Sequence, residues 1–329
     1  MTIEDQAKKF RDHVEALTRE IGKVIVGHSE VVRQVIVSIL AEGHALLEGV
    51  PGIGKTLLVR TISQCLNLRF SRIQFTPDLM PADILGTNIV VEDAQGRKAF
   101  EFQRGAIFGN LILADEINRA TPKTQSALLE AMQEKTVTVS GKRYPLEEPF
   151  FVLATQNPIE MEGTYPLPEA QVDRFLFKVQ VPASKLQELM EVIDRTTGKD
   201  VAGVQPILSG KDILDMRALA KEVPIASHVK EFAARLVLAT HPAEGSAIAK
   251  KYLRYGSSPR GAQSIVRAAK ILALMKGRYN VAFSDLKEAA FPALRHRMIL
   301  NFEAEAEGIR PDAILEKILT EIPEVAAAK

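Results

Sequence analysis

The sequence contains a single cysteine in 329 residues. One cysteine excludes an internal disulfide bond and a cysteine-rich zinc site. Cys65 lies in an apolar-periodic stretch, so we expect a small buried hydrophobic side chain there rather than a reactive thiol. The six histidines are also few, and their spacing matches no common set of metal ligands. These residue types therefore predict no metal centre of their own.

An excess of one charge and long hydrophobic runs are absent as well. Lys and Arg number 42 and Asp and Glu 41, a net charge of +1. That balance gives no support for a nucleic-acid or anionic-membrane partner, although it does not exclude a local patch of positive charge. No apolar run approaches the ~18–20 residues of a membrane span, so we expect no direct membrane insertion. The opening MTIEDQAKKF has no apolar core, and we expect no signal peptide. These absences together indicate a cytoplasmic protein.

The order of apolar stretches predicts an α/β protein. A length of 329 residues exceeds what one compact core usually holds, which favours two domains. Amphipathic spacing predicts helices over residues 3–21 and 31–40, and another over 123–133. Short, nearly continuous apolar runs are typical of strands in a parallel sheet that is covered on both faces. Five strands are expected: His44–Glu48, Phe70–Phe75, Leu111–Ala114, Phe150–Ala154 and Phe175–Val181.

Two segments interrupt this alternation and are typical of β-hairpins. Thr87–Phe102 carries two alternating runs joined around Ala94-Gln95-Gly96. Thr136–Leu146 carries two more, joined by Ser140-Gly141-Lys142. Both inserts could be simple surface decoration.

From about Pro182 onward the strand signal stops and helices are expected. Ser227 is expected to cap a helix over His228–Thr240, and Ser258 one over Pro259–Met275. Ser284 and Asp285 should cap a helix over Leu286–Arg297, and a fourth helix should begin near Pro311. We therefore expect an α/β core over residues 1–182 and a separate α-helical domain over residues 183–329.

The segment from Gly49 to Thr56 reads GVPGIGKT and fits the pattern G-x-x-x-x-G-K-[ST], the glycine loop below. Glycines let backbone N–H groups turn toward a phosphate chain, and the following helix adds its positive N-terminal end. Lys55 supplies a charge for the outer phosphates, and Thr56 a hydroxyl for a magnesium ion. On the order of one in a hundred chains of this length would match by chance. The loop indicates a nucleotide without saying what the nucleotide is for.

Two strand ends carry polar residues that suit phosphate chemistry. The strand Leu111–Ala114 runs into Asp115 and Glu116, and we expect its tip next to the glycine loop. Asp115 could hold magnesium there and Glu116 could polarise an attacking water, whereas two acids after a strand alone indicate only a return to solvent. Asn157 follows the next strand and could orient water, but an Asn-Pro pair equally favours a plain turn.

Several longer motifs occur in a fixed order: EGVPGIGKT, QFTPDLMPADILG, ADEINRA, ATQNPIEMEGTYPLPEAQVDRF, SSPRG and RHRM. In this order they resemble the AAA+ ATPases and, within them, the MoxR family. The resemblance extends from VIVGH near the N-terminus to RHRMIL near the C-terminus. It implies a P-loop AAA+ core with a five-stranded parallel sheet and two hairpin inserts, followed by an α-helical lid domain.

The resemblance also implies a role for individual residues. Glu116 would be the Walker B glutamate, Asn157 sensor 1 and Arg174 an arginine finger that reaches a neighbouring subunit's nucleotide. Arg260 would be sensor 2, reaching from the lid, and Thr56 and Asp115 would hold Mg²⁺. The expected ATP-binding set comprises the adenine-pocket segment Ile25, Val26 and Gly27 and the Walker A residues Gly49, Val50, Pro51, Gly52, Ile53, Gly54, Lys55, Thr56 and Leu57.

Each weaker assignment has a plain alternative. Arg174 could form a salt bridge with Asp173 or Glu169, Arg260 could be a solvated helix start, and residues 25–27 could be ordinary core. Gln74 could restrain Glu116 until a partner binds. For Arg119 a local ion pair is favoured over contact with a nucleotide across an interface, and His296 has no expected role beyond packing.

The implied function is ATP-driven, chaperone-like remodelling or activation of protein complexes by a ring, expected to be a hexamer. The hairpins would face the pore or a client, and the partner could be a separate protein with a von Willebrand factor A domain. A nucleic-acid motor is an alternative, since Gly96–Lys98 and Gly141–Arg143 each carry two cations near a hairpin tip. A slow nucleotide-gated binding switch would use the same residues and is a second alternative.

Overall fold

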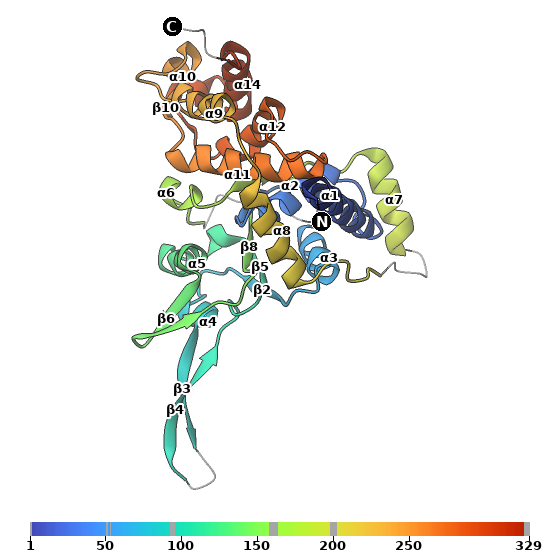
Figure 1. Ribbon diagram of the computed structural model, residues 1–329. Coiled ribbons are helices and arrows are strands. Elements are labelled where there is room, and N and C mark those ends of the chain that lie inside the picture. Colours follow the sequence, from blue (N-terminus) through green and yellow to red (C-terminus); the bar gives the residue numbers. More distant parts are fainter. Residues whose placement is uncertain are drawn as a thin grey trace.

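The computed structural model describes residues 2–50, 52, 54–92, 96–157, 164–197 and 203–325. Figure 1 shows a sheet with helices around it, a helical region above, and a hairpin that projects away from the body as an arm. The tip of that arm, where the expected turn residues Ala94 and Gln95 fall, lies outside the described residues. The arrangement agrees with the predicted AAA+ core and helical lid.

A five-stranded sheet forms the centre of the core, with strand order β2-β5-β8-β1-β9. All four neighbouring pairs in it are parallel, as the sequence predicted. The parallel direction brings the carboxyl ends of all five strands to one edge. The strands are β1 (Ala45–Glu48), β2 (Phe70–Gln74), β5 (Leu111–Asp115), β8 (Phe151–Gln156) and β9 (Phe177–Gln180).

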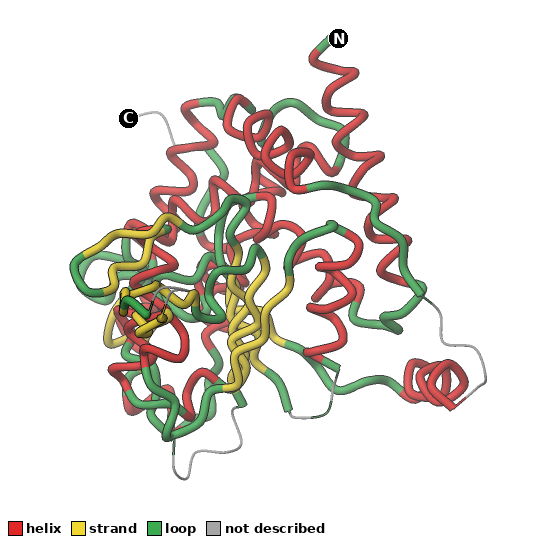
Figure 2. The backbone as a smooth tube through the Cα atoms, turned by 90° about the horizontal axis from the view of Figure 1, so that it is seen from below, coloured by secondary structure: helices red, strands yellow, loops and turns green. Residues whose placement is uncertain are grey.

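Successive side chains of each strand point to opposite faces of the sheet, so the apolar residues pack in two separate layers. Leu46 and Ile112 pack on one face with Leu128 of α5 (Pro122–Glu134) and Ile84 of α4 (Pro81–Leu85). Leu47, Leu113 and Leu153 pack on the other face against α1 (Ile3–Gly22), α2 (Ser29–Leu40) and α3 (Lys55–Cys65). Figure 2 shows the yellow strands in the middle with red helices to either side. Cys65 is fully buried in the second layer, as expected, and burial raises the pKa of its thiol to about 11.

Both predicted hairpins are present. The arm pairs β3 (Gly86–Glu92) with β4 (Lys98–Arg104), and the shorter hairpin pairs β6 (Thr136–Val139) with β7 (Lys142–Pro145). Gly86 has a φ of 98°, and a Cβ there would lie 2.3 Å from the carbonyl oxygen of Gln103. The two hairpins touch where the rings of Phe102 and Tyr144 stack 4.0 Å apart. This contact fixes the base of the arm, while Phe100 farther out is 80% exposed.

The C-terminal part is helical, as predicted, but more of it is helical than the capping signals indicated. Sequence reasoning overlooked α7 (Leu186–Thr197), α8 (Gly210–Glu222), α10 (Ala247–Tyr252) and α13 (Phe302–Ala306). It also overlooked the two-stranded sheet formed by β10 (Leu253–Tyr255) and β11 (Ile299–Leu300). The four helices expected there correspond to α9 (Ser227–Ala239), α11 (Pro259–Met275), α12 (Phe283–Leu294) and α14 (Pro311–Glu321).

Two predicted helix starts were wrong in detail. Ser227 is the first residue of α9, whose N-cap is Ala226, so the serine does not cap it. Asp285 lies inside α12 rather than before it, and its carboxylate accepts a hydrogen bond of 2.9 Å from the backbone N–H of Ala282. An acid in the first turn can satisfy a free N–H group as well as a preceding serine can, which moves the start of α12 to Phe283. Among the described helices, none combines the length and the apolar character that crossing a bilayer requires.

Candidate functional site

The glycine loop leaves β1 and enters α3 at the carboxyl edge of the sheet. Gly52 and Gly54 adopt φ values of 82° and 79°, which only glycine adopts without strain. The Nζ atom of Lys55 folds back and donates a hydrogen bond of 2.7 Å to the carbonyl oxygen of Gly49. Pro51 and Ile53 lie outside the described residues. The loop thus has the left-handed turns that a phosphate cradle requires.

The strand that carries Asp115 is not adjacent to the strand of the glycine loop. Sequence reasoning expected the tip of β5 next to the loop, but the sheet order inserts β8 between β5 and β1. The inserted strand supplies Thr155, which is fully buried. Its hydroxyl donates a 2.6 Å hydrogen bond to Oδ1 of Asp115 and accepts one of 2.8 Å from the N–H of Glu116. Thr155 therefore orients both acids, a role that no sequence motif had indicated.

Asp115 also has a cationic partner that sequence reasoning missed. Arg72 on β2 donates to Oδ2 of Asp115 from Nη2 at 2.7 Å and from Nε at 3.2 Å. The same guanidinium donates 2.7 Å to the side-chain oxygen of Gln74. Because 47% of the Arg72 side chain is exposed, this ion pair lies at the surface of the site and can be exchanged for another cation.

Glu116 is held in an uncommon backbone conformation and by two side chains. Its φ of 55° lies in the left-handed region, which costs a non-glycine residue energy and is often found at functional sites. One carboxylate oxygen accepts 3.0 Å from Nε2 of Gln74 and 2.9 Å from Nη1 of Arg119. The contact proposed between Gln74 and Glu116 is thus present, and so is the local ion pair favoured for Arg119.

The charges of these groups act on one another. Burial lowers the pKa of the Lys55 amine, and the carboxylates of Asp115 and Glu116 oppose that effect. Asn157 follows β8 and is buried at the same edge. One lysine, two acids and an amide thus gather where three of the parallel strands, β1, β5 and β8, end. This combination suits a ligand that brings its own negative charge and a divalent cation.

Beside the glycine loop lies a cavity of about 460 Å³, and α7 forms one wall of it. Of the expected ATP-binding residues, Ile25, Val26, Gly52, Gly54, Lys55 and Leu57 line this cavity. Gly27 and Thr56 adjoin lining residues in the chain, and Gly49 and Val50 precede Gly52 by three and two residues, but none of these four is part of the lining. Leu189 and Val192 of α7 line it together with Ile25 and Val26, and such apolar lining fits a flat aromatic base.

Hydrogen bonds from Arg195 and the absence of a side chain at Gly27 let α7 pack against the N-terminal segment. The guanidinium of Arg195 donates to the carbonyl oxygens of Gly22 and Lys23 at 2.9 and 2.7 Å. Gly27 has a φ of 65°, and a Cβ there would lie 2.6 Å from the carboxyl group of Glu188. Glycine at position 27 therefore lets α7 approach closely.

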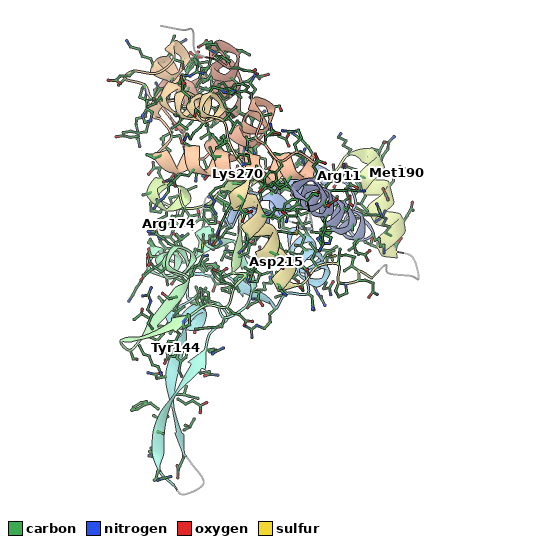
Figure 3. The ribbon with its side chains drawn as sticks, viewed as in Figure 1. Arg11, Tyr144, Arg174, Met190, Asp215 and Lys270 are labelled. Atoms are coloured by element: carbon green, nitrogen blue, oxygen red, sulfur yellow. The ribbon has the colours of Figure 1, made fainter. Side chains whose placement is uncertain are left out.

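Arg174 lies away from this cavity. It follows α6 (Glu169–Val172), and its Nη1 donates 2.8 Å to the carbonyl oxygen of Leu129 on α5. Figure 3 shows Arg174 on one flank of the molecule and Met190 of α7, beside the glycine-loop cavity, on the opposite flank. In the described part of the chain, Arg174 forms no ion pair with Asp173 or Glu169. Arg174 is therefore remote from its own chain's glycine loop.

Arg260 lies on the same flank as Arg174. Its Nη1 forms an ion pair of 3.2 Å with Oδ2 of Asp173, the residue before Arg174. Arg260 is not among the residues that line the glycine-loop cavity. The lid arginine thus binds the residue that immediately precedes the expected finger.

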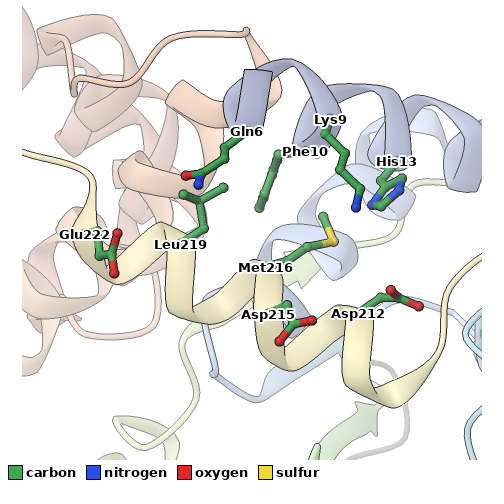
Figure 4. Close-up of a pocket in the computed structure, with 9 residues that line it drawn as sticks. All are labelled: Gln6, Lys9, Phe10, His13, Asp212, Asp215, Met216, Leu219 and Glu222. Atoms are coloured by element: carbon green, nitrogen blue, oxygen red, sulfur yellow. The ribbon is translucent and has the colours of Figure 1, made fainter. Parts of the chain in front are cut away.

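A second cavity, of about 310 Å³, lies between α1 and α8 and contains no glycine-loop residue (Figure 4). Lys9 and His13 extend from α1 and Asp212 and Asp215 from α8, with Phe10 on the α1 side. The Asp212 carboxylate is already occupied as the cap of α8, where it accepts from the N–H and the hydroxyl of Ser209. This cavity is therefore best described as a gap between two helices that is lined by charged side chains.

Comparison with known proteins agrees with this geometry. The model of the ATPase family associated with various cellular activities (AAA) matches residues 44–177, and the model of the AAA lid domain matches residues 245–318. Chaperone MoxR1 of Mycobacterium tuberculosis is 44% identical over 312 residues, which cover 94% of this chain and 82% of that protein. The chain belongs to the MoxR family of AAA+ ATPases.

Three further proteins match over nearly their full length. Protein MoxR of Paracoccus denitrificans is 31% identical over 346 residues and 99% of each chain. The uncharacterized protein YeaC of Bacillus subtilis is 41% identical over 92% of each chain. A crystal structure from Cytophaga hutchinsonii superimposes with a TM-score of 0.91 at 44% identity, over 98% of both chains. The similarity to known proteins therefore covers the N-terminal helix, the core and the lid.

Proposed function

We propose that this MoxR-family chain hydrolyses ATP to ADP and phosphate in a Mg²⁺-dependent reaction and uses the energy to remodel protein complexes. The gathering of Lys55, Asp115 and Glu116 at one edge of the sheet, beside the glycine-loop cavity, carries this proposal. ATP would bind with its base between residues 25–27 and α7 and its phosphates on the glycine loop. The backbone N–H groups and Lys55 would then neutralise the phosphate charge.

The oxygen donors present fit Mg²⁺. Magnesium is usually held by one or two carboxylates together with substrate phosphates, and Thr56 and Asp115 supply a hydroxyl and a carboxylate. Bound Mg²⁺ would neutralise charge on the transferred phosphoryl group. Asp115 would exchange Arg72 for the metal, and Thr155 would keep the carboxylate oriented through its 2.6 Å hydrogen bond.

The hydrolytic step would use Glu116 as the group that polarises water. In this state the Glu116 carboxylate is engaged by Gln74 and Arg119, so its release would accompany activation. Asn157 would orient the attacking water at the tip of the neighbouring strand. A carboxylate acting as general base contributes typically ~10²–10⁴ in rate.

A ring of subunits, expected to be a hexamer, would complete each site. The observation behind this step is the location of Arg174 on the flank opposite its own glycine-loop cavity. A residue on that flank would meet the nucleotide of a second copy in a head-to-tail ring. The guanidinium would then stabilise transition-state charge across the interface.

Movement of a lid over residues 183–329 against a core over residues 1–182 would pass the energy of hydrolysis to a client. The arm β3–β4 would contact that client, because its outer residue Phe100 is largely exposed. The name of the Mycobacterium relative, Chaperone MoxR1, supports a protein client. The partner could be a separate chain with a von Willebrand factor A domain.

The test measures phosphate release by the purified wild-type chain and by Glu116→Gln, each with Mg²⁺ and with EDTA. Wild type should hydrolyse ATP only with Mg²⁺, and Glu116→Gln should bind ATP normally while hydrolysis falls ~10²–10⁴-fold. Affinity capture with Glu116→Gln and ATP should retain a client protein. Salt-dependent stimulation of hydrolysis by DNA or RNA would instead support the nucleic-acid motor, and full biological function of Glu116→Gln would support the slow switch.

A further inference from the structure

Two residues that follow α12 of the lid, His296 and Arg297, bind the chain on both sides of Arg174. Arg297 donates from Nη2 to the carbonyl oxygens of Asp173 and Phe175 at 2.8 and 2.7 Å. His296 adds a 3.1 Å contact from Nε2 to the oxygen of Phe175. Carbonyl groups immediately before and immediately after Arg174 are therefore bound by a single guanidinium from the lid.

The Asp173 side chain binds the lid as well. Its Oδ1 accepts 2.8 Å from Nε of Arg297 and 2.8 Å from the hydroxyl of Ser258, and its Oδ2 pairs with Arg260. Ser258 is the N-cap of α11, but its hydroxyl bonds Asp173 instead of capping that helix. One carboxylate thus joins the start of α11 to the residues that follow α12.

Burial makes this arrangement rigid. The Arg297 side chain is 2% exposed, whereas the Arg260 side chain is 47% exposed. Burial lowers the pKa of Arg297 to about 10 and the Asp173 carboxylate opposes this effect, so the guanidinium keeps its charge at neutral pH. A buried ion pair often adds little stability over apolar packing of equal volume, and its attested use is to fix geometry.

We propose that Asp173 and Arg297 act as positioning residues, a clamp by which the lid holds Arg174 in place for the neighbouring subunit's nucleotide. The clamp rests on the proposed function, since it matters only if Arg174 acts across the interface. As a consequence, Arg174 would move whenever the lid moves, because the lid and residues 173–176 are bound together. A displacement of ~1 Å at a catalytic group can cost ~10² in rate, so a loosened clamp should be visible in kcat.

The test combines Asp173→Asn, which has nearly the shape of the native residue, with a complementation assay. Alone, Asp173→Asn should lower kcat ~10–100-fold and change KM for ATP less than about threefold, because its own glycine-loop site is intact. Mixed with Glu116→Gln subunits, which keep a normal clamp and finger, the Asp173→Asn sites should regain hydrolysis. Arg295→Lys is the matched control, since Arg295 bonds Asp312 and the oxygen of Lys178 instead of residues 173–176. Its kcat should stay within about twofold of wild type.

A parallel mixture of Arg174→Ala with Glu116→Gln distinguishes a failure of the clamp from a failure of the arginine finger itself. If Arg174→Ala is rescued and Asp173→Asn is not, the clamp is overturned while the finger stands. If neither is rescued, the proposed trans action of Arg174 fails. Should Asp173→Asn not assemble, Arg297→Lys replaces it in the same mixture. Failure of both variants to assemble, or wild-type kcat in either, overturns the proposal.

Discussion

The two candidate functional edges of the molecule are built in different ways. At the glycine-loop edge, formed by Lys55, Asp115 and Glu116, the decisive hydrogen bonds join tips of neighbouring parallel strands, such as Thr155 to Asp115 across 40 residues of chain. At the arginine edge, formed by Asp173, Arg174, Arg260 and Arg297, they join core to lid across 87 and 124 residues. The first edge needs only the sheet, whereas the second exists only when the lid is docked.

The edges also differ in how firmly their acids are held. Asp115 and Glu116 are paired with Arg72 and Arg119, whose side chains are about half exposed and can be displaced by a ligand. Asp173 is paired with the buried Arg297. We infer that the glycine-loop edge is made to exchange partners and the arginine edge to keep them.

The largest effect should come from removing the arginine edge's functional side chain. Arg174→Ala should lower kcat of the assembled protein ~10³–10⁵-fold, the usual contribution of an arginine finger, and leave ATP binding unchanged. The measurement is steady-state phosphate release together with the dissociation constant of a fluorescent ATP analogue. Arg254→Ala is the control, because Arg254 contacts Glu169 on the same flank through an exposed ion pair. Unchanged hydrolysis by Arg174→Ala would remove the finger from the account.

Acid should weaken the fold through two buried histidines, His44 at the amino end of β1, opposite the glycine-loop edge, and His296 at the arginine edge. Burial lowers the pKa of His44 to about 4, and its Nδ1 accepts 3.0 Å from the N–H of Val152. Burial likewise lowers the pKa of His296, at the arginine edge, well below its usual value. The unfolded chain binds protons near pH 6.5 and the folded chain does not, so stability is full above pH 6.5 and declines as pH falls toward 4.

Each histidine should contribute a loss of about 1.4 kcal/mol per pH unit in that window. The carboxylate of Glu42, whose pKa is lowered to about 2 mainly through hydrogen bonds from Lys135 and Lys221 that outweigh its burial, adds a loss only below about pH 4.5. Urea unfolding at pH 7.5, 6.5 and 5.5 measures the slope, and His44→Asn should flatten it. A slope unaltered by His44→Asn would mean that His44 is not buried in the neutral form.

A smaller effect should distinguish the two sides of α7. Leu189 faces the glycine-loop cavity, so Leu189→Ala should weaken ATP binding about tenfold through lost apolar contact and leave kcat unchanged. Met190, the next residue, is 57% exposed and outside the cavity lining, so Met190→Ala is the matched control. Equal effects of the two variants on the ATP dissociation constant would contradict the assignment of α7 as a wall of the nucleotide site.

The smallest effect concerns the restraint on Glu116. Gln74→Ala removes one hydrogen bond to the Glu116 carboxylate, which is worth about 1 kcal/mol, so unstimulated hydrolysis should rise a few fold. Single-turnover hydrolysis without a client measures it. A fall in that rate would show that Gln74 assists the acid instead of restraining it.

The contrast between the edges also explains what the sequence could predict. The glycine loop and the acids after β5 are short contiguous patterns with a local physical cause, and they were found at the correct edge of the sheet. Thr155 and Arg72 were missed because their roles depend on which strands are neighbours, and the order β2-β5-β8-β1-β9 is not written in any one segment. The sites' proposed roles remain predictions.

The lid was harder to predict for two reasons. Helix starts were sought through serine caps, so α7 was missed even though Leu186, Leu189, Met190 and Ile193 have helical spacing. Apolar spacing alone would have found it. Asp173 and Arg297 were recognised only as members of the motifs DRF and RHRM, because no local pattern indicates that a guanidinium will bind carbonyl groups 124 and 122 residues away. Distant polar contacts of this kind require the fold.

The most direct test of the composite site is hydrolysis by an equal mixture of Arg174→Ala and Glu116→Gln subunits, each nearly inactive alone. In a head-to-tail ring about one quarter of the interfaces would join an intact Glu116 site to an intact Arg174, so roughly a quarter of wild-type activity should return on mixing. Activity no higher than the sum of the two separate variants, in a mixture shown to co-assemble, would contradict the account.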